Sequence, residues 1–333
     1  MDSLKCIRND FYGEGSVKGF PSLERLYLKK LCSLEEWYPS NENEREWLFP
    51  RLESMIIKDC PKLESFPFLP CVKHLALRSC KETIVRSLRS LPSLSSLVIY
   101  LIAELTFFPK GSLCNLTALK SLNIVRCRKL KSIPEEIENL TELTSLKLTD
   151  CQDLVSLPEG LQKLTSLTSF TIKSCKSLKS LPAMGIQGTK SSLCLLQIFR
   201  CDNLTSLSEG LQYLSSLELF VILGCSELEL SKEDFQYLIS LQTLRLKELP
   251  KLTSFPDIQN LNLLGDLEIS KCENLRIFPQ GLQCLTSIQS LRIEYVHRDL
   301  HAQIEKEKGK DWAKIVGALG LAPSLPSSFQ YTN

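Results

Sequence analysis

The chain of 333 residues contains few of the side chains on which catalytic and metal centres depend. It has three histidines, at His74, His297 and His301; the last two lie four positions apart with no third metal ligand near them. The motifs Gly-x-x-x-x-Gly-Lys-Ser/Thr, Gly-x-Ser-x-Gly and His-Glu-x-x-His are missing, and so is any Cys-x-x-Cys pair. The sequence therefore predicts no catalytic residue, no cofactor and no metal site.

Long apolar runs and a strong charge imbalance are also missing. The apolar runs are a few residues long, whereas a membrane-spanning helix needs about eighteen or more. The chain has 40 basic and 38 acidic residues. Its formal net charge of +2 does not favour binding of nucleic acid. No secretory signal opens the sequence. We expect a chain without a membrane span in the cytoplasm, with the nucleus or the periphery of the plasma membrane as alternatives.

What the sequence does contain is a repeat of about 24 residues. One unit places Leu119, Leu122, Ile124, Cys127 and Leu130 at fixed spacings, and the same spacings recur around Cys151 and Cys175. With small slips the pattern runs from Leu23 to Val296, which makes about twelve units. A period of this length with this leucine spacing is the signature of leucine-rich repeats.

Each unit predicts one short strand followed by a return segment. Apolar and variable residues alternate around Leu122 and Ile124, as in a strand with one buried face, and such strands bury that face by stacking in parallel. Phrases such as Pro158-Glu-Gly-Leu-Gln, Ser208-Glu-Gly-Leu-Gln and Pro279-Gln-Gly-Leu-Gln predict short helical turns, which the glycine keeps weak.

We therefore predict an α/β fold, a horseshoe-shaped leucine-rich-repeat solenoid. Its parallel β-sheet lines the concave face, and short helices and turns form the convex face. The solenoid is expected to cover residues 1–316, with an acidic loop inserted at 37–47 and a disordered tail at 317–333. The loop is expected to be solvated, with contact to a basic partner surface as the alternative.

Most of the fourteen cysteines belong to the repeat. Eight of them share one repeat position, where the chain leaves the strand and a small side chain that can hydrogen-bond buried peptide groups is needed. We expect these eight to be reduced, buried and structural rather than paired in disulfides or bound to zinc: Cys60, Cys80, Cys127, Cys151, Cys175, Cys201, Cys225 and Cys272.

The variable strand residues pave the concave face, and one stretch of them is apolar. Neighbouring strands place an apolar group beside a basic rim, which is the anatomy of a protein interface. The apolar residues are Leu195, Phe199, Leu219, Val221 and Leu223, and the rim is Lys173, Arg200, Arg245 and Lys247. The alternative is that neighbouring side chains bury the apolar group and leave little surface for a partner.

Particular phrases resemble a known family, the leucine-rich-repeat region of plant nucleotide-binding disease resistance proteins with coiled-coil amino termini. They are Phe20-Pro-Ser-Leu-Glu, Leu34-Glu-Glu-Trp37, Asp59-Cys-Pro-Lys-Leu63 and Gly309-Lys-Asp-Trp312-Ala-Lys-Ile315. The resemblance implies protein partners: a pathogen effector, a guarded host protein, or the nucleotide-binding domain of such a receptor. The chain lacks that domain and its phosphate loop, so we expect a truncated product or fragment that binds no nucleotide itself.

Other functions fit the repeat less well. A leucine-rich-repeat adaptor, for example one that recruits substrates to a ubiquitin ligase, is the main alternative, although no F-box-like helical segment is present. A secreted inhibitor would show asparagine in the ladder, Gly-x-Ile-Pro after it and paired cysteine caps, and these are missing. An enzyme is the least favoured class, because the fold confers no catalysis by itself.

Overall fold

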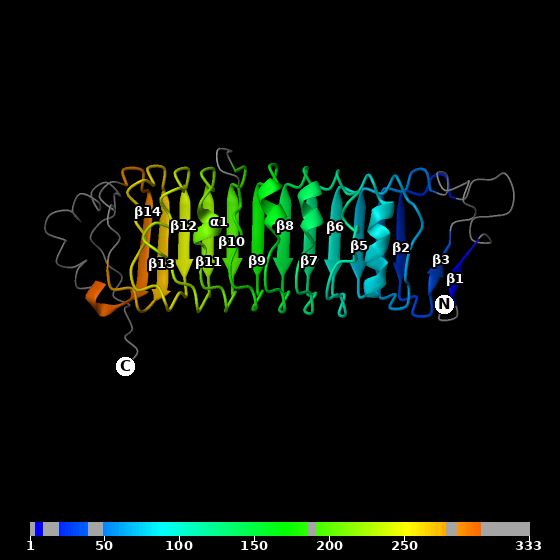
Figure 1. The fold of residues 1–333 in the computed structure, drawn as a ribbon, viewed down its shortest axis with the longest axis horizontal. Coiled ribbons are helices and arrows are strands. Elements are labelled where there is room, and N and C mark those ends of the chain that lie inside the picture. The colour runs from blue at the N-terminus through cyan, green and yellow to red at the C-terminus, as the bar shows by residue number, and fades with distance from the viewer. Residues whose placement is uncertain (1–3, 9–19, 39–48, 186–190, 278–284, 301–333) are drawn as a thin grey trace.

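In the computed structural model, residues 4–8, 20–38, 49–185, 191–277 and 285–300 are described. They form a ladder of parallel strands that follows the chain from one end of the molecule to the other (Figure 1). One sheet holds twelve strands, in which each strand pairs with the next one along the chain. In order they are β2 (Arg25–Lys29), β4 (Ser54–Lys58), β5 (His74–Arg78), β6 (Ser96–Tyr100), β7 (Ser121–Val125), β8 (Ser145–Thr149), β9 (Ser169–Lys173), β10 (Leu195–Phe199), β11 (Leu219–Leu223), β12 (Thr243–Lys247), β13 (Asp266–Cys272) and β14 (Ser290–Val296).

A second sheet of two strands lies at the amino-terminal end. It pairs β1 (Cys6–Ile7) with β3 (Glu36–Trp37), also in parallel. Ile7 and Trp37 are buried and extend the solenoid core toward this end. The fold is thus the predicted leucine-rich-repeat solenoid with a parallel sheet.

The core follows from the alternation in each strand. In β7 the second and fourth residues, Leu122 and Ile124, are fully buried, while the first, third and fifth are only partly covered. The same pattern holds from β4 to β12, and the buried residues form one continuous cluster. Because burial of a leucine or isoleucine side chain contributes about 1.5–3 kcal/mol, each unit is stabilised chiefly by its neighbours.

Helical turns are few and short. Within the described residues they include the 3₁₀ helices η3 (Glu82–Ser90), η4 (Glu135–Asn139) and η5 (Glu159–Lys163) and the α-helical turn α1 (Ser208–Leu211). Two of the three predicted turns, at 158–162 and 208–212, are confirmed as η5 and α1; the third, at 279–283, lies outside the described residues. Leu161 and Leu211 belong to the same core as the inward strand residues, so these turns lie on the other side of that core from the sheet.

A backbone turn with positive φ ends most strands of the long sheet. The residue that follows each of these strands, for example Arg126 at φ 57° and Gly224 at φ 70°, adopts the left-handed conformation. Its N–H donates to the carbonyl of the last residue in the next strand; the N–H of Arg126, for example, bonds Thr149 at 2.8 Å. This bond continues the ladder past the strand ends and fixes the register at the carboxyl edge of the sheet.

The eight repeat cysteines follow this turn, and all are buried. Their thiols lie near backbone carbonyls: Cys60 Sγ lies 3.8 Å from the oxygen of Leu28 on the preceding strand, and Cys80 Sγ lies 3.5 Å from that of Ile57. Every cysteine within the described residues is a free thiol. The structural role predicted for the repeat cysteines is confirmed.

Several predicted features lie outside the described residues. These are most of the acidic insert at 37–47, the tail at 317–333, His301 and the phrase that begins at Gly309. The predicted limit of the solenoid at residue 316 therefore stays a prediction. Within the described part of the chain, no helix is long and apolar enough to span a lipid bilayer.

Candidate functional site

The first, third and fifth residues of each strand of the long sheet point away from the core and form a surface that we call the open sheet face. No residue at these positions from β2 to β12 is fully buried. Their backbone groups are already used in the ladder between strands, so the side chains alone determine what this face can bind. The face is therefore a binding surface rather than an enclosed site.

The predicted apolar residues meet on two neighbouring strands. Leu195 of β10 pairs with Leu219 of β11, and Phe199 pairs with Leu223 at the other end of the same strands; Val221 lies between the two pairs, opposite Gln197. We call Leu195, Phe199, Leu219, Val221 and Leu223 the apolar cluster. All five side chains are half-buried, so their neighbours cover them in part and some apolar surface stays open.

The predicted basic rim differs on its two sides. Lys173 of β9 and Arg200, the residue after β10, are exposed, and no carboxylate of the described residues lies within ion-pair distance of either. On the other side, Arg245 Nη2 lies 2.8 Å from Asp266 Oδ2, and Lys247 Nζ lies 2.6 Å from Glu268 Oε1. These two cations are neutralised, so only the side that carries Lys173 and Arg200 offers free positive charge.

Glu268 is the centre of that neutralising network. It is only 8% exposed, and besides Lys247 its carboxylate lies 3.7 Å from both Arg245 and Arg292. Asp266 bonds the Arg245 guanidinium and raises the pKa of that arginine. A carboxylate with three cations around it holds the side chains of β12, β13 and β14 in fixed positions.

A second group on the open sheet face was not singled out from the sequence. Lys29, Lys58, Arg78 and Tyr100 occupy the fifth position of four consecutive strands and lie side by side. The Arg78 guanidinium carbon lies 4.2 Å from the centre of the Tyr100 ring. The signal that could have found this group is the column of fifth-position residues, which reads Lys, Lys, Arg, Tyr.

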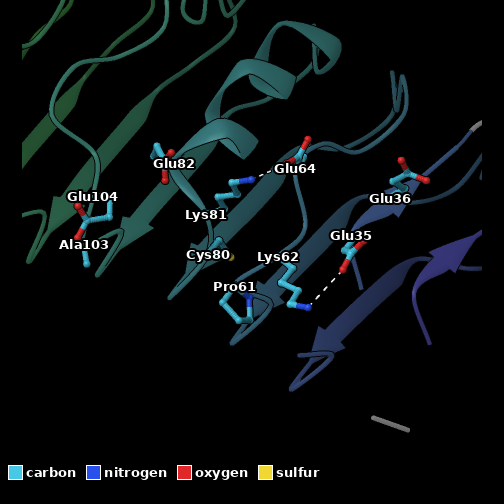
Figure 2. A pocket seen from close by; sticks show the side chains of 10 residues that line it. All are labelled: Glu35, Glu36, Pro61, Lys62, Glu64, Cys80, Lys81, Glu82, Ala103 and Glu104. Carbon is cyan, nitrogen blue, oxygen red and sulfur yellow. Dashed lines mark hydrogen bonds and ion pairs between the residues drawn. The ribbon is translucent and has the colours of Figure 1, made fainter. Parts of the chain in front are cut away.

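The described residues also contain a cavity of about 640 Å³ beside the strand ends at the amino-terminal side of the solenoid (Figure 2). Its lining is mostly acidic, with two lysines among the glutamates. The residues are Glu35, Glu36, Pro61, Lys62, Glu64, Cys80, Lys81, Glu82, Ala103 and Glu104. Figure 2 shows Lys62 directed at Glu35 and Lys81 directed at Glu64.

Glu64 and Cys80 of the cavity have perturbed pKa values, and neighbouring groups engage both. A hydrogen bond from Lys81 lowers the pKa of Glu64, so this carboxylate stays ionised, as in an ordinary surface ion pair. Burial raises the pKa of Cys80 to about 12, and its thiol bonds backbone carbonyls. A protonated, engaged thiol is a poor nucleophile. No group of three His, Cys, Asp or Glu side chains that could hold a metal ion occurs in the described part of the chain.

The two described histidines, His74 and His297, lie far apart in the solenoid. His74 begins β5 and is exposed on the open sheet face. His297 Nδ1 lies 3.3 Å from Asp299, near the end of the described residues.

No protein-family model matches the chain. Among curated proteins it is similar to the disease resistance protein RGA1 of Solanum bulbocastanum, with 37% identity over 118 residues, and to the TMV resistance protein N of Nicotiana glutinosa, with 29% identity over 147 residues. These matches cover 35% and 36% of this chain but only 12% of each relative.

A solved structure agrees with this fold. The leucine-rich repeat domain of the type III effector XopL superimposes with a TM-score of 0.50 and 25% sequence identity, covering 62% of this chain and 70% of that domain. Together with the ladder of twelve strands, the comparisons identify the chain as a leucine-rich-repeat solenoid that is similar in sequence to plant disease resistance proteins.

Proposed function

We propose that the chain is a non-enzymatic protein-recognition module of plant innate immunity that binds its partner on the open sheet face. The partner is a pathogen effector, a guarded host protein, or the nucleotide-binding switch domain of a resistance protein, which the module would hold in its inactive state. The similarity to resistance proteins of two plants supports the immune role. The matched segments span 12% of those relatives, so their whole activity enters here as a proposal.

The observation that carries this proposal is the apolar cluster. Five apolar side chains on two paired strands are half-buried, and Lys173 and Arg200 on one side are charged and exposed. Interfaces concentrate their binding energy in such apolar centres, while a surrounding polar rim excludes water. Five of the six outward positions on β10 and β11 are apolar, and this concentration is best explained as a contact site.

Neither nucleotide binding nor catalysis is part of the proposal. The chain carries no phosphate-loop motif. Burial raises the pKa of the Cys80 and Cys127 thiols, which bond backbone carbonyls, and Glu35 and Glu64 of the cavity pair with lysines, so none of these groups is placed as a nucleophile or as a proton donor. We expect the protein to act in the cytoplasm, where reduced cysteines are stable.

A pull-down from plant leaf extract tests the proposal, repeated with a separately expressed nucleotide-binding domain of a related resistance protein. The variant Phe199→Ser/Leu223→Ser should lose the captured partner and keep the circular-dichroism melt of the wild type. Val98→Ser/Val125→Ser is the matched control, because it removes two half-buried apolar side chains from the same face outside the apolar cluster. Equal capture by all three proteins would refute the assignment. Capture of ubiquitin-ligase components without the nucleotide-binding domain would favour the adaptor function instead.

A further inference from the structure

Charge is distributed unequally along the open sheet face. From β2 to β12 no aspartate or glutamate occupies an outward strand position, and the first carboxylates on this face are Asp266 and Glu268 of β13. Six lysines and arginines occupy outward positions from β2 to β9: Arg25, Lys29, Lys58, Arg78, Lys147 and Lys173. The amino-terminal part of the face is therefore positively charged, although the whole chain is close to neutral.

Three of these cations form a continuous row. The strand register pairs Lys29 with Lys58, and Lys58 with Arg78. Adjacent strands are about 4.8 Å apart, so the row crosses three strands in about 10 Å and reaches Tyr100 after one more step. Within the described residues, none of the three cations has a carboxylate at ion-pair distance, although ion pairs are common elsewhere in the solenoid. We call Lys29, Lys58 and Arg78 the basic row.

The structure holds Arg78 in place without neutralising it. Its guanidinium stacks on the Tyr100 ring at 4.2 Å. Arg126 approaches the same ring at 5.7 Å and donates a hydrogen bond of 2.7 Å to the Tyr100 hydroxyl, which fixes the ring. Arg126 in turn lies 3.8 Å from Asp150, so its own charge is balanced. Stacking restricts the Arg78 side chain and leaves its N–H donors available for a bidentate carboxylate.

We propose that the basic row binds an acidic segment of a protein partner, which lies across strands β2 to β6. This inference rests on the proposed function, in which the open sheet face is the surface that contacts a partner protein. The row is linear, and an extended chain of three or four residues spans about the same length. Two acidic residues at alternate positions of such a segment, about 7 Å apart, would lie within reach of the three cations, and Tyr100 would flank its end.

Carboxylates fit this row better than phosphates. Phosphate sites in proteins usually add backbone N–H donors from a helix amino terminus or a backbone nest. The backbone N–H groups of β4, β5 and β6 are committed to the strand ladder, and the basic row crosses the last three strands at the β2 end of the sheet rather than a helix end. This surface can therefore bind an acidic ligand through its side-chain charges, without backbone N–H donors.

Fluorescence anisotropy of the full chain with a fluorescein-labelled peptide of alternating glutamate and serine tests the inference. Lys29→Gln/Lys58→Gln/Arg78→Gln should bind the peptide at least about tenfold more weakly, because three charge pairs are lost. The matched control Lys110→Gln/Lys120→Gln/Lys232→Gln changes the net charge equally at exposed lysines outside the strands and should bind within about twofold of the wild type. Thermal melts of both variants check that the solenoid is intact.

Two outcomes would overturn the inference. Equal weakening by both triple variants would show that only net charge matters. Tighter binding of inorganic tripolyphosphate than of the peptide, lost in the basic-row variant, would show that the row recognises phosphate. Phe199→Ser/Leu223→Ser should bind the acidic peptide like the wild type, so the pull-down and the peptide assay can fail independently of each other.

Discussion

The structure predicts that Gly160→Ala lowers the free energy of unfolding, whereas helix propensity alone predicts that it raises it. A Cβ atom added to Gly160 would lie 2.8 Å from the carbonyl oxygen of Glu135 and 3.2 Å from Glu138 Cβ, both on η4 of the preceding unit. The N–H of Gly160 also donates to Glu135 Oε2 at 2.9 Å. The close contact is to backbone, which a side-chain rotation cannot relieve, so Gly160→Ala would push η4 and η5 apart.

The two interpretations give opposite effects on stability. If glycine merely weakens a helical turn, Gly160→Ala should raise the free energy of unfolding by up to about 1 kcal/mol. Overpacking costs about 1–3 kcal/mol. Because η5 is a single short turn in which the propensity gain is small, we expect a net destabilisation of about 1–2 kcal/mol.

Urea unfolding followed by circular dichroism measures this difference. Gly265→Ala is the control, because a Cβ there would meet nothing closer than 3.7 Å and the residue does not require positive φ. We expect that control to be stabilised by about 0.4–1 kcal/mol through the unfolded state. If Gly160→Ala were as stable as the wild type or more stable, while Gly265→Ala behaved as expected, the close-packing argument would be refuted.

Two further predictions concern charge and thiols. Glu268→Gln should lower the free energy of unfolding by about 1–3 kcal/mol, because Arg245, Lys247 and Arg292 lose their shared carboxylate, and urea unfolding at low and high salt would show a smaller loss at high salt. Burial raises the pKa of Cys127 from 9.0 to about 11, so the unfolded chain releases this proton first and the stability that the thiol contributes is lost as pH rises from about 9 to about 11. Thermal melts across that range should fall less steeply for Cys127→Ser than for the wild type, and identical slopes would contradict the assignment.

The strands and the core were predictable because their positions are set by spacing alone. In a stack of parallel strands, the residue two places after Leu122 must also face the core, whatever lies around it. The role of Gly160 was not predictable in this way. Its constraint comes from Glu135 in the previous unit, and the distance between two return segments is fixed by the packing of the whole unit rather than by the local sequence.

In the candidate site, too, the repeat spacing predicts which residues are neighbours but not how their side chains are placed. The pairing of Phe199 with Leu223 follows from the repeat register and was predicted. The neutralisation of Arg245 was not predicted, because its 2.8 Å contact with Asp266 depends on how the long arginine side chain lies across the next strand, which the spacing does not determine. The contact of Arg126 with Tyr100 could not be read from spacing, since Arg126 lies in the turn after β7, where the positive φ sets the direction of its side chain.

The positive-φ residue after each strand also affects the surface beside the apolar cluster. In the described structure eleven residues other than glycine have positive φ, a conformation that costs roughly 1 kcal/mol each. Gly224, directly after Leu223, is the exception among the turns that end the long-sheet strands, and a Cβ there would lie 3.2 Å from Arg200 Cγ. Glycine at this one turn avoids the backbone strain of a positive φ. It also leaves room for the Arg200 stem beside the cluster. An arginine whose stem packs there while its guanidinium reaches solvent combines apolar contact with charge, which is the combination that a protein interface requires.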